Sequence, residues 1–221
     1  MSESRFFRIN EQDIDHLRNH WHALINRYTR DENEIGKLFE LVARHYSEKG
    51  RFYHNLSHIK ALLESSDSIK SIEDRAAVDL AIWFHDVIYK TRKNDNEEKS
   101  AEMAAISLGK LSVPPGIINT VRDMIIATKT HGADTLTKDA KVFLDLDLSI
   151  LGAREEIYKA YSDAIRKEYS WVPGFLYRRG RRNILESFLK RESIYYTEEM
   201  AARYDAQARR NIENELRELD A

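Results

Sequence analysis

Cysteine is absent from this chain of 221 residues. Its absence excludes disulfide bonds, thiolate ligands to a metal and a cysteine nucleophile. Proline and glycine are scarce, with 3 and 8 residues respectively, which leaves little material for a β-sandwich, a barrel or a long linker. The composition therefore favours a helical protein without covalent cross-links.

Neither sign of charge is in excess. The 35 lysines and arginines oppose 37 aspartates and glutamates, for a formal net charge of -2, so nothing attracts the whole chain to nucleic acid or to an anionic membrane. The first residues lack the hydrophobic core of a signal peptide, and no run approaches the ~20 apolar residues of a membrane span. We expect a cytoplasmic protein with neither nucleic acid nor a membrane as its partner.

Apolar residues recur at helical spacing along nearly the whole chain, and the alternation typical of strands is rare. Hydrophobic residues make up 42% of the chain, and its length suffices for one good-sized core. We predict an all-α, single-domain bundle over residues 1–221, with about ten helices and the C-terminal helices (about 154–219) packed alongside. The predicted helices cover approximately residues 11–28, 31–50, 56–65, 73–88, 101–111, 115–128, 142–151, 154–171, 174–191 and 197–219.

His85 and Asp86 are adjacent within a strongly apolar helical run, so we expect both to be buried. A buried carboxylate without a partner costs several kcal/mol or becomes neutral. A divalent cation would satisfy both side chains. The alternative is a structural pair, with His85 bonded to a backbone carbonyl and Asp86 to an arginine.

His54 and His58 are four residues apart. If both lay on one helix, the two imidazoles would point to the same side and could share a metal ion. Because Asn55 and Ser57 resemble capping residues, His54 could instead lie outside the helix. His58 would then coordinate, and His54 would stand nearer to solvent as a proton donor. The alternative is a capping region with two surface histidines.

Asp145 and Asp147 interrupt another apolar segment. Two buried carboxylates need strong compensation. Residues two apart on a helix are separated by about 200° of rotation, so they cannot face the same point. We expect one of them to meet a cation and the other a distinct partner, such as an arginine or a helix N-terminus. An Asp–Arg pair is the competing explanation for both.

Together these segments offer His58, His85, Asp86 and one aspartate of the 145/147 pair as ligands. Imidazole and carboxylate ligands without thiolates suit one divalent ion of Mn, Fe, Co, Ni, Zn or Mg. Four protein ligands on an octahedral ion leave positions for water, and a metal-bound water ionises near neutral pH and can attack phosphorus.

The order His…His-Asp…Asp resembles the HD-domain superfamily of metal-dependent phosphohydrolases, whose motif residues bind a divalent metal inside an all-α bundle. By position His58, His85, Asp86 and Asp147 match that motif, and Asp147 is preferred to Asp145 because a Leu-x-x-Leu stretch follows it. The resemblance covers roughly residues 50–152. The whole chain is also similar to a bacterial family of predicted HD phosphohydrolases carrying Asn-Glu-x-x-Ser-Ala and Leu-Asp-x-Asp-Leu-x-x-Leu-Gly.

The segment from Tyr53 to His58 is similar to the Tyr-His-Asn-x-x-His motif of cyclic-nucleotide phosphodiesterases. That resemblance implies that His54 protonates the leaving group while His58 binds the metal. Several related hydrolases place an acid shortly after the His-Asp doublet to steer water, and here Glu97 could fold back to do so, or it could simply start a helix. His131 could serve a second ion or a phosphate, or it could cap a helix.

The resemblance implies a metal-dependent phosphohydrolase acting on a phosphomonoester or phosphodiester, such as a nucleotide. The candidates for holding the phosphate are Lys90, Arg92 and Arg166. One alternative is a non-catalytic sensor that binds a nucleotide or a metal, and a weaker one is a redox enzyme with two irons. The sequence leaves open whether the helices predicted at 11–28 and 197–219 mediate a homodimer.

Overall fold

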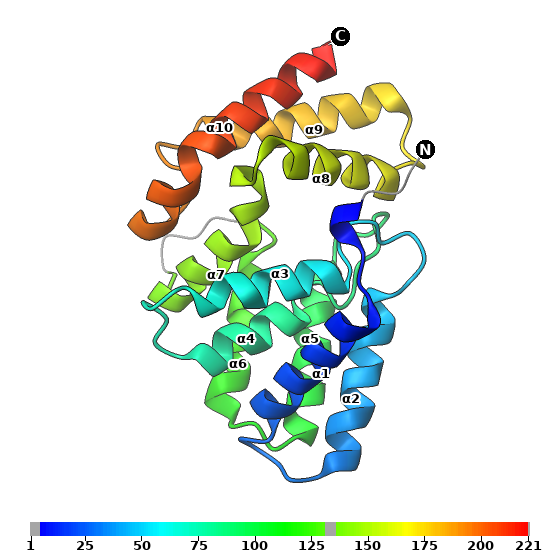
Figure 1. Ribbon diagram of the computed structural model, residues 1–221, viewed down its shortest axis with the longest axis vertical. Helices are drawn as coiled ribbons and strands as arrows, with labels where there is room; N and C mark the ends of the chain where they lie inside the picture. The colour runs from blue at the N-terminus through cyan, green and yellow to red at the C-terminus, as the bar shows by residue number, and fades with distance from the viewer. Residues whose placement is uncertain (1–4, 131–135, 221) are drawn as a thin grey trace.

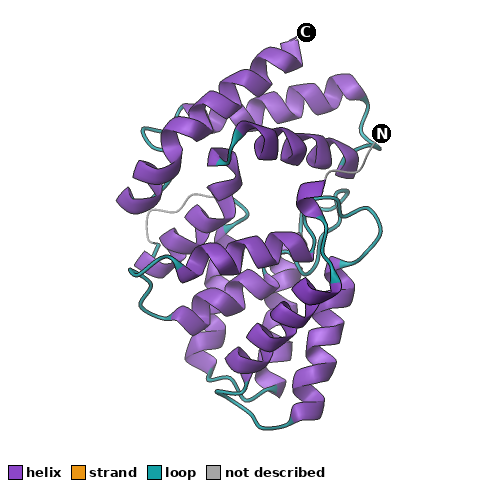
Figure 2. Ribbon diagram, in the orientation of Figure 1, coloured by secondary structure: helices purple, strands orange, loops and turns teal. Residues whose placement is uncertain are grey.

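Helices form all the regular structure that can be described. The computed structural model describes residues 5–130 and 136–220, which contain ten α-helices, two short 3₁₀-helices and no strand (Figure 2). The predicted all-α bundle is therefore confirmed. Within these residues no helix combines the length and apolar character that crossing a membrane requires.

The helices follow the predicted order, although several of their ends differ from the prediction. In chain order they are α1 (Glu11–Ile25), α2 (Glu32–Tyr46), α3 (Leu56–Asp67), α4 (Arg75–Phe84), α5 (Asn96–Lys110), α6 (Pro115–Ala127), α7 (Lys138–Leu148), α8 (Glu155–Glu168), α9 (Gly174–Leu189) and α10 (Glu198–Asp220). The 3₁₀-helices are η1 (Arg5–Phe7) and η2 (Ser149–Gly152). Helix α5 begins earlier than predicted because its first turn is polar and carries no apolar signal.

Side-chain caps explain where α2 and α3 begin. Asp31 accepts hydrogen bonds from two backbone N–H groups in the first turn of α2, and Asn55 accepts one from Ser57 at the start of α3. Asn55 was one of the two residues predicted to cap this helix, and its role is confirmed. Because Asn55 is the cap, His54 lies in the connector before α3 and not on the helix.

The core of the group formed by α1–α7 is built around α4. Trp83 of α4 packs edge-on against Trp21 of α1, with 5.3 Å between ring centroids, and against Phe39 of α2, with 6.1 Å. All three rings are buried, and so is every residue from 76 to 84. Burying one such side chain contributes about 1.5–3 kcal/mol, so the C-terminal end of α4 is held firmly in place.

The apolar pattern predicts that this helix continues through His85 and Asp86, but α4 ends at Phe84. The Asp86 N–H donates to the hydroxyl of Tyr46, and the Asp86 carbonyl accepts from Arg51. These tertiary hydrogen bonds replace the helical ones. The prediction was wrong here because local periodicity does not report such long-range partners.

Helices α8, α9 and α10 lie together at one end of the molecule, across the group formed by α1–α7 (Figure 1). A buried bidentate ion pair joins Arg181 of α9 to Glu215 of α10, at 2.9 and 3.0 Å, and Tyr158 of α8 donates to the same carboxylate. Breaking such a pair would leave an uncompensated buried charge. The three helices are therefore held as a unit beside the segments that carry the histidines.

Candidate functional site

Three side chains from three helical segments converge inside the protein. The Nε2 atoms of His58 and His85 lie 3.2 Å apart, and Asp147 Oδ1 lies 3.3 Å from the first and 3.6 Å from the second. His58 comes from α3, His85 from the C-terminus of α4 and Asp147 from α7. This group can hold a metal ion, because its ligand atoms all lie within 4.8 Å of one another.

A hydrogen bond to the backbone fixes the orientation of the His85 ring. Its Nδ1–H donates to the carbonyl of Ile82 at 2.9 Å. In the neutral imidazole this bond places the lone pair on Nε2, which faces His58 and Asp147. A backbone carbonyl on the far nitrogen is the usual support of a metal-binding histidine. The donor set and the tautomer of His85 therefore fit a divalent cation.

Asp86 stands at the edge of the same group. Its Oδ2 lies 3.2 Å from His85 Nε2 and 3.9 Å from His54 Nε2. Its side chain is 20% exposed, whereas that of His85 is 1% exposed. Asp86 therefore places a second carboxylate between the buried cluster and solvent.

The field inside the cluster is negative. Burial alone would lower the pKa of His85, but the carboxylates of Asp86 and Asp147 raise it well above its ordinary value. Burial lowers the pKa of His58. Burial would raise the pKa of Asp86, but the positive charges of His85 and His54 lower it below its ordinary value. A site that stabilises positive charge to this degree favours a cation.

Asp145 lies on the other side of α7 and has a different partner. Its carboxylate accepts hydrogen bonds from the backbone N–H groups of Tyr196 and Thr197 at 2.7 and 2.8 Å, and from the Thr197 hydroxyl. These groups directly precede α10, so Asp145 serves the N-terminus of that helix. Burial raises the pKa of Asp145. Asp147 alone of the pair faces the histidines.

His54 lies beside the cluster and is tied to α8. Its Nδ1–H donates to Glu168 Oε2 at 2.6 Å, and its ring stacks on Tyr89 with 4.2 Å between centroids. Burial would lower the pKa of His54, but the negative charges of Glu168 and Asp86 raise it. These charges favour the protonated ring, whose Nε2 lies near the Asp86 carboxylate.

Glu168 has the richest set of donors near the site, and the sequence analysis did not identify it. Oε1 accepts from the backbone N–H groups of residues 52, 53 and 54, at 2.8, 2.7 and 3.0 Å, and Oε2 also accepts from the Tyr89 hydroxyl. Burial would raise the pKa of Glu168, but His54 and these donors lower it to about 2. Its helical spacing could have revealed it: Glu168 continues the buried face of α8 that Tyr161 and Ile165 belong to, so the sequence pattern places a carboxylate on an apolar face.

Arg51 is the second residue that the sequence analysis did not single out. Its guanidinium donates to the carbonyls of His54, Asp86 and Val87 at 3.1, 2.7 and 2.9 Å. It therefore ties the connector that carries His54 to the segment that carries Asp86. No local pattern points to it, since all its partners are backbone carbonyls and two of them, those of Asp86 and Val87, are distant in the sequence.

A cavity of about 650 Å³ opens onto the cluster. His54, His85, Asp86, Asp147 and Glu97 line it, and His58 is not part of its lining. Glu97 lies in the first turn of α5, so it starts a helix as one interpretation predicted, and it also lines the cavity.

The three predicted phosphate-binding side chains do not line this cavity. Lys90 forms an ion pair with Glu48, and the guanidinium of Arg92 lies over the ring of Trp171. Arg166 donates to two backbone carbonyls and stacks on Tyr177. The basic residues that do line the cavity are Lys129, Arg181 and Arg191. His131 lies outside the described residues.

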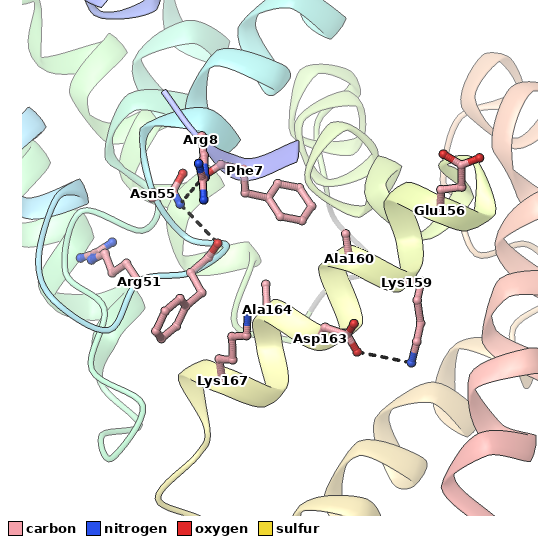
Figure 3. A pocket seen from close by; sticks show the side chains of 11 residues that line it. Phe7, Arg8, Arg51, Asn55, Glu156, Lys159, Ala160, Asp163, Ala164 and Lys167 are labelled. Carbon is pink, nitrogen blue, oxygen red and sulfur yellow. Dashed lines mark hydrogen bonds and ion pairs between the residues drawn. The ribbon is translucent and has the colours of Figure 1, made fainter. Parts of the chain in front are cut away.

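A second cavity, of about 430 Å³, lies beside the same connector (Figure 3). Phe7, Arg51, Phe52 and residues of α8 line it, and Figure 3 shows Lys159 paired with Asp163 at its edge. None of the described residues that line it is a histidine. The group suited to a metal ion belongs to the first cavity.

The chain matches no protein-family model, and no curated protein or solved structure is significantly similar to it.

Proposed function

We propose that this chain is a metal-dependent phosphohydrolase of the HD type, which hydrolyses a phosphomonoester or phosphodiester. One observation carries the proposal: the Nε2 atoms of His58 and His85 converge with Asp147 beside a cavity lined by His54, whose ring is hydrogen-bonded to Glu168. The order of these residues along the chain, which resembles that of the HD superfamily, supports it.

His58, His85, Asp86 and Asp147 would hold the metal ion. A divalent cation there supplies a Lewis acid that neutralises phosphate charge and lowers the pKa of water. Asp86 contributes from the solvent side, where its Oδ2 lies 3.2 Å from His85. The hydrogen bond from His85 Nδ1 to Ile82 keeps the other nitrogen of that ring available as a ligand.

His54 is the proposed proton donor to the leaving oxygen. Glu168 accepts the Nδ1–H, so the remaining N–H of the imidazolium would be at Nε2, on a residue that lines the cavity. The neighbouring carboxylates raise the pKa of His54 and so favour its protonated form. An acid in this position lowers the barrier by protonating the alkoxide as the P–O bond breaks. Glu168 is a positioning residue, since it acts through His54.

Glu97 is the proposed residue that orients the attacking water, because its side chain lines the cavity from the start of α5. Arg191 lines the same cavity, whereas Lys90, Arg92 and Arg166 do not, and it is the basic residue that we propose to face the phosphate.

The test is turnover of a panel of phosphate esters with added Mn²⁺ or Co²⁺, together with the metal content of protein purified without chelators. Wild type should hydrolyse at least one ester, and Asp86→Asn should lose ~100-fold or more of that rate. Asp123→Asn, which changes an exposed aspartate of α6, is the matched control and should keep it. Stoichiometric metal without turnover would favour the non-catalytic sensor, whereas about two irons per chain would favour the redox enzyme.

A further inference from the structure

The lining of the cavity has two chemically different parts. One part is polar and includes His54, Asp86 and Asp147 of the candidate site. The other part consists of aliphatic and aromatic side chains from the end of α7, from η2, from α8 and α9 and from the segment between these two helices. These are Leu148, Ile150, Leu151, Tyr161, Ile165, Tyr169, Val172, Leu176, Tyr177, Ile184 and Phe188.

Two of these apolar residues are unusually exposed. Leu176 and Ile184 of α9 keep 47% and 52% of their surface open to solvent although both line the cavity. They are eight residues apart and therefore lie on one face of the helix, with Gly180 between them. A Cβ atom at Gly180 would meet nothing within 4 Å. The three residues form an open apolar face, which we call the α9 face, at the cavity.

The volume of the cavity exceeds what a phosphate group needs. At about 650 Å³ it falls in the range of pockets that enclose a drug-sized organic ligand, about 300–1,000 Å³. A ligand whose phosphate reaches the histidines therefore has room for a sizeable organic group against α9.

The charges of the lining disfavour a polyanion. Three basic residues (Lys129, Arg181 and Arg191) line the cavity against three acidic ones (Asp86, Glu97 and Asp147). Arg181 is already paired with Glu215, and Lys129 donates to Glu98 and to the carbonyl of Asn94. Beyond His54 and the metal-binding residues, the described part of the lining thus has no excess of positive charge to match further phosphates.

From these observations, and resting on the proposed function, we infer that the substrate carries a single phosphoryl group on an uncharged, mainly apolar or aromatic alcohol. The phosphoryl group faces His54 and the metal-binding residues. The alcohol covers the α9 face, where burial of apolar surface contributes to binding. Nucleoside triphosphates and small polar phosphates are poor substrates on this view.

The test compares 1-naphthyl phosphate, glycerol phosphate and ATP as substrates. Wild type should show a kcat/KM for the naphthyl ester at least ~10-fold above those of the other two. Gly180→Leu fills the space on the α9 face and suits a helix, so the variant should fold. It should lower the ratio of the naphthyl to the glycerol value by ~10-fold. ATP or glycerol phosphate as the preferred substrate would overturn the inference.

Phe175→Asp is the matched control, because Phe175 is 66% exposed on the same helix but does not line the cavity. It should leave the ratio unchanged. An equal loss in Phe175→Asp and Gly180→Leu would show that α9 acts only through stability and would contradict the inference.

Direct binding separates this inference from the proposed function. Calorimetry with the non-hydrolysable 1-naphthylmethylphosphonate measures affinity without turnover. Binding that weakens ~10-fold in Gly180→Leu supports the ligand class even if no ester is hydrolysed, an outcome that would overturn the proposed function alone. Equal affinity of wild type and Gly180→Leu would overturn the inference even if esters are hydrolysed.

Discussion

His54 and Glu168, 114 residues apart in the sequence, are joined by a hydrogen bond of 2.6 Å between Nδ1 and Oε2. The same carboxylate accepts the backbone N–H groups of the connector that carries His54. Through this contact α8 sets both the position of the imidazole and its charge. The C-terminal helices thus take part in the proposed chemistry.

The first prediction concerns the pH profile. A general acid must be protonated, so kcat/KM should fall as pH rises through the pKa of His54, which lies above the ordinary value. Glu168→Gln removes the negative charge that raises this pKa, and the alkaline limb should therefore move to lower pH. The measurement is kcat/KM between pH 5 and 9, roughly the range in which histidine titrates. Glu155→Gln on the exposed start of α8 is the control, and a limb that stays in place in Glu168→Gln would contradict the role of Glu168.

The second prediction concerns stability in acid. Because the pKa of Glu168 is depressed from 4.5 to about 2, its ionised form stabilises the fold above pH 4.5, and this contribution is lost as pH falls toward about 2. The shift corresponds to about 3 kcal/mol at neutral pH. Urea unfolding should show a large loss of stability in Glu168→Gln at pH 7 and a smaller one at pH 3. A loss of equal size at both values would show that the contribution is not ionic.

The third prediction separates the two aspartates of α7. Asp147→Asn removes a carboxylate from the group with His58 and His85, so the purified variant should lose most of its metal. Asp145→Asn changes the bonds to the N-terminus of α10, so it should keep the metal and unfold about 1–2 kcal/mol more easily. Elemental analysis and denaturant melts test both variants. If Asp145→Asn lost its metal and Asp147→Asn kept it, Asp147 would not be the metal ligand.

The fourth prediction concerns the packing of α10. A Cβ atom at Gly152 would lie 2.6 Å from the Cβ of Tyr204 and 2.8 Å from its carbonyl oxygen. Gly152→Ala should therefore destabilise the fold by about 1–3 kcal/mol. Gly36, in the interior of α2, has nothing within 4 Å, and Gly36→Ala should stabilise the fold by about 0.5–1 kcal/mol. Thermal melts of the two variants should shift in opposite directions.

The helices could be predicted from the sequence because their signals are local. Apolar spacing reports the buried face of each helix, and capping residues such as Asp31 and Asn55 mark its start. Where a tertiary contact intervened, the prediction failed: Tyr46 and Arg51 end α4 before His85, and they lie far from it in the sequence.

The candidate site was predicted only in part. The resemblance to the HD motif selected His58, His85, Asp86 and Asp147, and the structure brings these four side chains together. The phosphate-binding role predicted for Lys90, Arg92 and Arg166 was based on charge and sequence position alone. Neither shows which way a long side chain points or which acid or ring it meets.

The sequence by itself determined the all-α fold, the order of the helices and the presence of polar residues in apolar segments, because each depends on neighbours within one or two turns. Only the tertiary structure decided which aspartate of α7 faces the histidines, which carboxylate holds His54 and what surrounds the rest of the cavity. Those outcomes depend on contacts between segments distant in the chain, which local periodicity does not encode.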